Sequence, residues 1–232
     1  MNQIFPPSLL FQFQTPIRRH DSIPKTRGGL LSLSPEHSIF APARVNSVSH
    51  GNSGVQKQKS SGSAPAFEIR MAWNPSGIGV SVEVVGKKHG PEGSRSDLRN
   101  SDFVRLMIDT RHTASVHRMT SYCQTFLILP VDTAAKNVPT VIHGESNLTG
   151  LNVRGNLTEI QLRYHSRPDG YLIETWMPAT VLHGFVEAAE IRRIGFYCLV
   201  HDTELGELPL NVGDDFPVTI DPSQWLSMEL SE

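Results

Sequence analysis

Hydrophobic and polar residues alternate along most of this chain, and a period of two is typical of strands with one buried face. The alternation runs through Ile69, Met71 and Trp73, and it resumes after the turn-forming sequence Asn-Pro-Ser-Gly at residues 74–77. Two such runs joined by a turn predict a β-hairpin. Further strands are predicted at residues 9–17, 30–33, 103–109, 125–129, 160–164, 171–177 and 195–202.

The segment 103–109 predicts a strand with two different faces. Val104, Leu106 and Ile108 share one face, which we expect to point into the core. The other face carries Phe103, Arg105, Met107 and Asp109.

One short helix is predicted at residues 179–182. Pro178 suits the first turn of a helix, and Gly184 is a typical residue just past a helix end. Strands that recur throughout the chain indicate an all-β fold, namely a two-layer antiparallel β-sandwich of the jelly-roll or immunoglobulin-like kind with this single helix.

The 232 residues, 38% of them hydrophobic, suffice for one large β domain. Residues 46–65 are rich in Ser, Gly and Lys and contain almost nothing to bury, which predicts a flexible surface insertion within a single domain spanning residues 1–232. The alternative is that this segment is a linker between an N-terminal arm and a smaller domain.

Charge and composition exclude several classes of partner. With 21 basic and 23 acidic residues, the chain lacks the cationic field that nucleic-acid binding requires. No apolar run approaches the ~20 residues needed to cross a bilayer. The N-terminus lacks a basic start before its apolar part, so we expect no signal peptide and a cytoplasmic protein. Cys123 and Cys198 lie in apolar stretches and are predicted to be free thiols.

Five segments between Phe67 and Leu230 carry a resemblance to a known family. They are MAWNPSGIGVSVEVVGK, SDFVRLMIDTR, YLIETWMPATVLHGF, RRIGFYCLVHDTELGE and DPSQW. Together they resemble the family-9-type carbohydrate-binding domains, within the wider DOMON-like sandwiches, and the chain is most similar to stand-alone members of unknown function. The resemblance implies a non-catalytic module that binds a saccharide. Members sometimes hold structural calcium, and no other cofactor is expected.

The family holds its ligand between exposed aromatic rings, and the chain offers three tryptophans for that role. Trp73 shares the strand face of Ile69 and Met71, and Trp176 lies on the face of Leu172 just before a proline. Both patterns favour core packing over a sugar platform. Trp225 is expected to seal one end of the sandwich.

A polar cluster in the segment 103–130 is the better candidate site. Asp109 and Arg111 lie two apart on a predicted strand, and the following loop brings His117 and Arg118, with Tyr122 as a nearby ring. Arginine offers a planar fork of donors, and with a carboxylate it can bind vicinal hydroxyls or an anion. The alternative is an Asp-Arg pair that braces the loop.

A second acidic cluster follows the strand 195–202. Asp202, Glu204 and Glu207 could complement the first cluster electrostatically or bind a hard cation such as calcium. We include Asp202 and Glu204 in the predicted ligand site. The alternative is a solvated turn.

No motif in the sequence predicts catalysis. The chain contains no HExxH, CxxC, nucleophile elbow or phosphate-binding loop, so neither catalytic nor metal-ligating residues are assigned. Two functions remain: a binding module for a carbohydrate or related polar small molecule, and a structural or protein-interaction sandwich that no longer binds sugar. The second requires a broad exposed apolar patch and a protein partner.

Overall fold

The structure is a computed structural model that describes residues 14–40, 66–112, 116–144, 155–213 and 215–232. Its strands belong to one curled sheet, in the order β7-β6-β5-β10-β12-β1-β3-β4-β9-β8, with β11 beside β10 and β2 beside β3. The bounds are β1 Gln14–Arg19, β2 Ser38–Phe40, β3 Ala66–Asn74, β4 Gly77–Val85, β5 Phe103–Asp109, β6 Cys123–Asp132, β7 Val138–His143, β8 Gln161–Arg167, β9 Gly170–Pro178, β10 Arg193–Asp202, β11 Gly206–Pro209 and β12 Leu226–Ser231.

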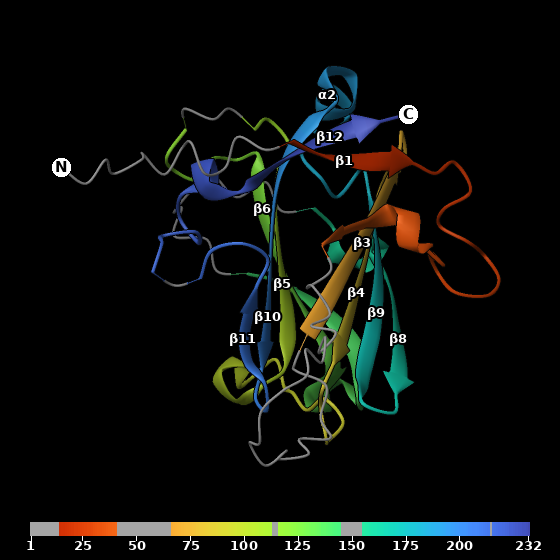
Figure 1. Cartoon of the computed structure of the whole chain (residues 1–232), viewed down its shortest axis with the longest axis vertical. Helices are drawn as coiled ribbons and strands as arrows, with labels where there is room; N and C mark the ends of the chain where they lie inside the picture. The colour runs from red at the N-terminus through yellow and green to blue at the C-terminus, as the bar shows by residue number, and fades with distance from the viewer. Residues whose placement is uncertain (1–13, 41–65, 113–115, 145–154, 214) are drawn as a thin grey trace, which may run out of the picture.

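The curled sheet folds into two facing layers (Figure 1). Strands β7, β6, β5, β10 and β11 form one layer, strands β2, β3, β4, β9 and β8 form the other, and β12 and β1 connect them at one end. At the other end of the path β7 comes into contact with β8, so the sheet nearly closes into a barrel-like sandwich. The predicted all-β fold is therefore confirmed. One detail differs, because β1 pairs in parallel with both β12 and β3, whereas the remaining pairs are antiparallel.

The core lies between the two layers, as the alternation predicts. Val104, Leu106 and Ile108 of β5 point into it, and Val80, Val82 and Val84 of β4 face them from the other layer. The predicted hairpin is β3–β4, which pairs Trp73 with Ile78 across the turn. Each of these aliphatic side chains is almost fully removed from water, which stabilises the fold by about 1.5–3 kcal/mol per residue.

The outer face of each layer is also partly covered. A segment that includes Ile23, Leu30 and Leu31 packs on Trp176 over the β9 layer. On the β10 layer, Trp225 is fully buried and donates its indole N–H to the carbonyl of Val218. The prediction that the tryptophans serve packing is thus confirmed, since all three are buried and Trp73 is only 2% exposed. Trp225 was expected to seal one end of the sandwich, but it packs on the outer face of the β10 layer instead.

Residues 30–33 were expected to form a strand, and this is wrong. The amides of Leu30, Leu31 and Ser32 donate to the carboxylate of Glu174 at 2.8–3.0 Å instead of joining a ladder. A side chain on β9 thereby takes the hydrogen bonds that a neighbouring strand would have made.

The predicted helix at residues 179–182 is also misplaced. These residues form tight turns, and the α-helix α2 runs over Phe185–Ile191. Gly184, taken as the residue after the helix, precedes it with φ +81°, a left-handed conformation that glycine adopts readily. Phe185 and Ala188, three residues apart, bury one side of the helix.

Two predictions fall partly or wholly outside the described residues. The expected strand at 9–17 is described only from Gln14, and the expected insertion at 46–65 lies outside the description. Strands β1 and β2 precede this insertion and β3 follows it, and all three belong to the same sheet. No helix in the described ranges is long and apolar enough to span a bilayer. Cys123 and Cys198 are free, as expected.

Candidate functional site

The polar cluster predicted from the sequence lies at the end of β5. The Asp109 side chain is buried, and its Oδ1 accepts a hydrogen bond from the backbone N–H of Arg111 at 3.1 Å. The Arg111 guanidinium instead lies over the ring of Tyr122, 4.7 Å from its centroid. Asp109 and Arg111 therefore do not form the bracing pair that was the alternative to a ligand site, because the carboxylate accepts the Arg111 backbone N–H and the guanidinium lies over Tyr122.

Tyr122 is half-buried and packed on several sides. Its ring centroid lies 4.9 Å from that of the His183 imidazole, with the two rings tilted by 31°, and a β-carbon at Gly184 would lie only 2.6 Å from its Cδ1. Since the Arg111 guanidinium also lies on the ring, the neighbouring side chains leave little of the Tyr122 ring open to a sugar. We call this end of the sandwich, around Asp109, Arg111 and Tyr122, the rim.

His117 and Arg118 are exposed and lie further along the same rim. The Nδ1 of His117 is 2.9 Å from the hydroxyl of Ser223 and 3.4 Å from Oδ2 of Asp221. Partial burial alone would raise the pKa of Asp221, but hydrogen bonds from Ser223 and His117 hold it below 3.8. Both partners contact the same ring nitrogen, whereas a catalytic triad uses the two nitrogens for separate roles. This trio therefore has the residue types of a triad without its geometry.

Asp202 and Glu204 lie at the opposite end of the sandwich from Asp109. In the antiparallel pair β5–β10, Asp109 is opposite Gly195, and Asp202 is seven residues further along β10, or roughly 23 Å away. The two predicted clusters therefore cannot form one site. The expectation that they complement each other electrostatically is wrong.

Asp202 is an interior residue that forms a buried ion pair. Its carboxylate lies 2.6 Å from Nζ of Lys87, which is also 3.1 Å from Asp102. Burial disfavours the charged ammonium, yet hydrogen bonds to Asp202 and Asp102 raise the pKa of Lys87 above 10.5. The ammonium takes the place that a hard cation would need. Across the described ranges, no group of three or more His, Cys, Asp or Glu side chains could hold a metal ion.

Glu204 closes the loop next to this buried pair. Its carboxylate accepts hydrogen bonds from the backbone N–H groups of Lys88 at 2.8 Å and of His89 at 3.1 Å. These bonds lower the pKa of Glu204 below 4.5, the bond from Lys88 most of all. The ligand role predicted for Glu204 stays a prediction. The hydrogen bonds present connect the turn after β10 to the segment that follows β4.

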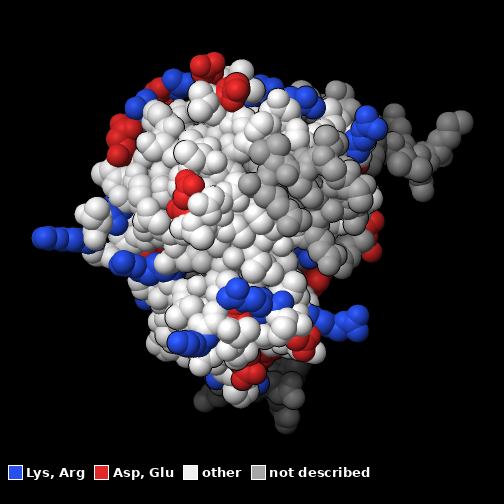
Figure 2. Space-filling view, turned by 180° about the vertical axis from the view of Figure 1, so that it is seen from behind, with Lys and Arg blue, Asp and Glu red and all other residues white. Residues whose placement is uncertain are grey.

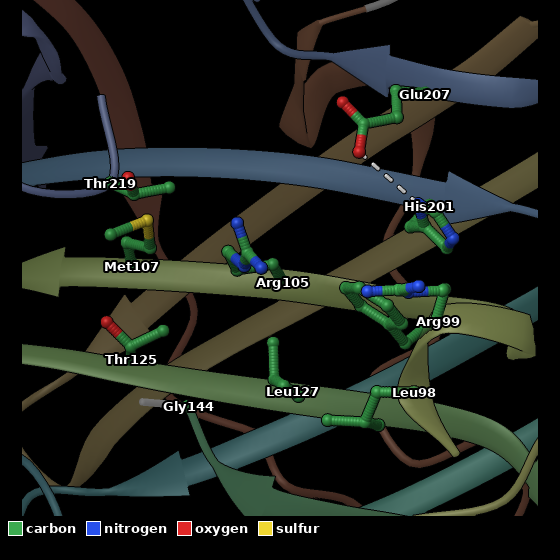
Figure 3. Close-up of a pocket in the computed structure, with 11 residues that line it drawn as sticks. Leu98, Arg99, Arg105, Met107, Thr125, Leu127, Gly144, His201, Glu207 and Thr219 are labelled. Atoms are coloured by element: carbon green, nitrogen blue, oxygen red, sulfur yellow. Dashed lines mark hydrogen bonds and ion pairs between the residues drawn. The ribbon is translucent and has the colours of Figure 1, made fainter. Parts of the chain in front are cut away.

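A concave surface lies elsewhere, on the outer face of β5, β6 and β10. This groove has a volume of about 650 Å³, within the range of small-molecule sites. Arg105 lies at the centre of the group, with Arg99 and His201 on one side and Met107 and Thr219 on the other (Figure 3). The lining residues are Leu98, Arg99, Phe103, Arg105, Met107, Thr125, Leu127, Gly144, His201, Glu207 and Thr219.

The groove has an apolar base and polar walls. Phe103, Met107 and Leu127 are buried and supply the base, since they alternate with the side chains that point into the core. The ring of His201 stacks on Phe103 at 4.8 Å and stays partly exposed. Its Nδ1 lies 3.3 Å from Oε1 of Glu207 on β11 (Figure 3). The wall at this end is therefore an aromatic surface beside a carboxylate.

Two arginines in the groove have no acidic partner among the described residues. Arg105 is half-buried between Leu127 of β6 and Leu199 of β10, and its guanidinium lies 5.8 Å from the ring centroid of Phe103. Arg99 projects from the 3₁₀ turn Leu98–Asn100 at the groove edge. Neither forms an ion pair within the described ranges.

The groove was not predicted, because the candidate ligand residues were assigned to the end of β5 and not to its outward face. Phe103, Arg105 and Met107 were placed on the outward face, but the predicted ligand contacts were assigned further along, from Asp109 onwards. The sequence pattern that could have indicated the groove is the outward face of β5, where Arg105 lies between the apolar residues Phe103 and Met107. Arg99 and Glu207 come from segments whose position beside β5 depends on the topology.

Charges are mixed on the face of the molecule seen from behind. Lys and Arg side chains are interspersed with Asp and Glu, and no extended patch of one sign appears there among the described residues (Figure 2). This distribution agrees with a net charge of −2.

Similar solved structures support the fold. The sequence matches no family model, and no curated protein matches it. Among solved structures, the chain is similar to a carbohydrate-binding module family 9 from Caldicellulosiruptor kristjanssonii in complex with cellotriose, with 12% identity, a TM-score of 0.55 and 94% of each chain covered. It is also similar to such a module from the same organism in complex with glucose, with 14% identity, a TM-score of 0.51, and 77% of this chain and 80% of that one covered. The chain therefore has a family-9-like fold, as the motifs indicate.

Proposed function

We propose that the protein is a non-catalytic module that binds a saccharide in the groove formed by β5, β6, β10 and β11. The observation that carries the proposal is this groove, with its apolar base and hydrogen-bonding walls, on a fold whose solved neighbours were captured with cellotriose and glucose. The finer placement of the chain, as a DOMON-like sandwich of jelly-roll or immunoglobulin-like topology, is part of the same proposal.

The groove supplies the two kinds of contact that a sugar ring needs. A pyranose has an apolar face of C–H groups, which can pack on the partly exposed ring of His201 above the apolar base. Its hydroxyls are donors and acceptors, and they match the carboxylate of Glu207 and the guanidinium of Arg105. A volume of about 650 Å³ accommodates one or two sugar units.

No specific observation on the described residues favours the alternative, a protein-interaction sandwich, which requires a broad exposed apolar patch. Large apolar side chains that are exposed in the described part of the chain are Val138, Val186, Ile191 and Ile220. They come from β7, α2 and a turn near residue 220, and none of them lines the groove.

Titration calorimetry with glucose, cellotriose and a panel of other neutral sugars tests the proposal. We expect saturable binding to at least one of them. His201→Ala, which removes the exposed ring from the wall, should weaken that binding roughly fivefold or more.

Tyr122→Ala is the matched variant for the rim cluster predicted from the sequence. We expect it to bind like the parent protein, with unfolding curves showing that both variants are folded. Weaker binding in Tyr122→Ala alone would move the site to the rim around Arg111. Absence of binding to every saccharide, neutral or acidic, would contradict the proposed function.

A further inference from the structure

The two arginines of the groove carry an inference about which saccharide is bound, and it rests on the function proposed above. Arg105 is held in the middle of the sheet face, on the central strand of β6, β5 and β10. Its neighbours in register are Leu127 and Leu199, both buried. The half-buried guanidinium lines the groove and has no acidic partner in the described ranges, so its donors are available to an anionic ligand.

Arg99 enters the same groove from a different segment. It projects from the turn Leu98–Asn100, ahead of β5, and lies near Arg105 and His201 in the close-up (Figure 3). Two cationic side chains in one concavity repel each other unless an anion lies between them. Arg99 is exposed and also has no acidic partner in the described ranges, so it adds a second set of donors to the same groove.

The charge of the lining defines the ligand further. Arg99 and Arg105 contribute two positive charges, and Glu207, engaged with His201, contributes one negative charge. The groove therefore has an excess of one positive charge when His201 is neutral. A carboxylate carries one negative charge, and its planar pair of oxygens matches the fork of a guanidinium.

We propose that the groove selects an acidic saccharide, a hexuronic acid or an oligomer of it, whose carboxylate binds between Arg99 and Arg105. The sugar ring then packs on the apolar base around Leu127, and its hydroxyls reach Glu207 and the threonines of the lining. Glu207 disfavours ligands with a larger negative charge, so a phosphorylated sugar, which carries nearly two negative charges, binds less well than a carboxylated one.

The test compares pairs of sugars that differ only at carbon 6. Calorimetry compares the binding of glucuronate with that of glucose, and the binding of galacturonate with that of galactose. Each titration is made at low ionic strength and again in about 0.5 M salt, which screens the interactions between exposed charges. We expect at least one acid to bind about tenfold or more tightly than its neutral partner, and salt to reduce this preference.

Variants then assign the preference to the two arginines. Arg105→Met and Arg99→Met keep a long apolar side chain and remove the charge, and each should abolish most of the preference for the acid. Arg105→Lys, which keeps the charge without the fork, should retain part of it and guards against misfolding of the methionine variant. Arg27→Met removes an exposed arginine on the other layer and should bind like the parent protein.

The possible outcomes separate this inference from the proposed function. Binding of neutral sugars without any preference for the acids would overturn the inference alone. A preference that survives in both methionine variants, or that disappears only in Arg111→Met, would also overturn it. If acetate or sulfate competes as well as the uronate does, the groove is a simple anion site and the inference is wrong. Binding of no saccharide at all would overturn the inference and the proposed function together.

Discussion

Among individual side chains, Lys87 shows most clearly how burial and charge act together. Its side chain is 2% exposed, and its ammonium donates to Asp102 and to both carboxylate oxygens of Asp202. The two carboxylates also accept hydrogen bonds from the backbone N–H groups of Thr203 and Glu204. The three residues come from segments far apart in the sequence. They tie the end of β10 to the segments that follow β4 and precede β5.

Lys87→Met should destabilise the protein by about 3–5 kcal/mol, because it leaves two buried carboxylates without a counter-charge. Urea unfolding monitored by tryptophan fluorescence measures the change. Lys88→Met is the matched control, since Lys88 is the exposed neighbour, and surface substitutions usually stay within about 0.5 kcal/mol. A loss of less than 1 kcal/mol in Lys87→Met would show that the ion pair contributes little.

The residues of the predicted site show which contacts between side chains could be predicted from the sequence and which could not. Asp109, Arg111 and Tyr122 do come together at the end of β5, as expected from their spacing. The partners that engage them, His183 and the Asp109 cap on the Arg111 amide, depend on three-dimensional positions that no periodicity encodes. Asp202 was expected in a ligand site or a solvated turn, and its burial depends on its ion pair with Lys87, a residue to which the sequence patterns assigned no role.

Among strands and loops, the segment that covers the β9 layer depends on one carboxylate. Glu174 accepts three backbone N–H groups from residues 30–32 and lies 3.0 Å from Nε2 of His165. Burial alone would raise its pKa, but the hydrogen bonds from Ser32, His165 and the neighbouring amides hold it below 4.5. The charged carboxylate is thus the form that fixes the segment.

Glu174→Gln should therefore cost about 1–3 kcal/mol at pH 7, because an amide cannot accept all of these bonds. A depressed pKa contributes stability that is present above the unfolded value of about 4.5 and is lost as the pH falls through the folded value. The difference in unfolding free energy between the parent protein and Glu174→Gln should accordingly shrink below pH 4.5. The exposed Glu229→Gln serves as control, and a difference that is constant from pH 7 to pH 3 would contradict this account.

Most strands were predictable because core-facing hydrophobic residues alternate along the sequence with residues that point away from the core. The hairpin β3–β4 and the strands β5, β9 and β10 alternate in this way, although the structure buries most of their outward side chains as well. The failures occur where hydrophobic residues are buried without a ladder. Leu30 and Leu31 are as buried as strand residues, yet their amides bond to Glu174, and α2 was missed because only Phe185 and Ala188 mark its buried side.

For the molecule taken together, the sandwich buries its tryptophans and presents a different surface to a ligand. Trp73, Trp176 and Trp225 are at most 3% exposed, so the sites that the family resemblance would suggest first are occupied by the chain's own packing. The groove over β5, β6 and β10 instead combines His201, two arginines and a carboxylate. The fold was readable from sequence patterns, whereas the groove exists only once β10, β11 and the turn at Leu98–Asn100 surround β5.

The account depends most on where a saccharide touches the protein, and backbone amide chemical-shift mapping during a titration with glucuronate and glucose tests this directly. We expect the largest shifts at residues 98–107, at residues 125–127 and at residues 199–207, which border the groove. Shifts confined to Thr110, Arg111, Tyr122 and the turn before α2 would place the ligand at the rim and contradict the groove as the binding site.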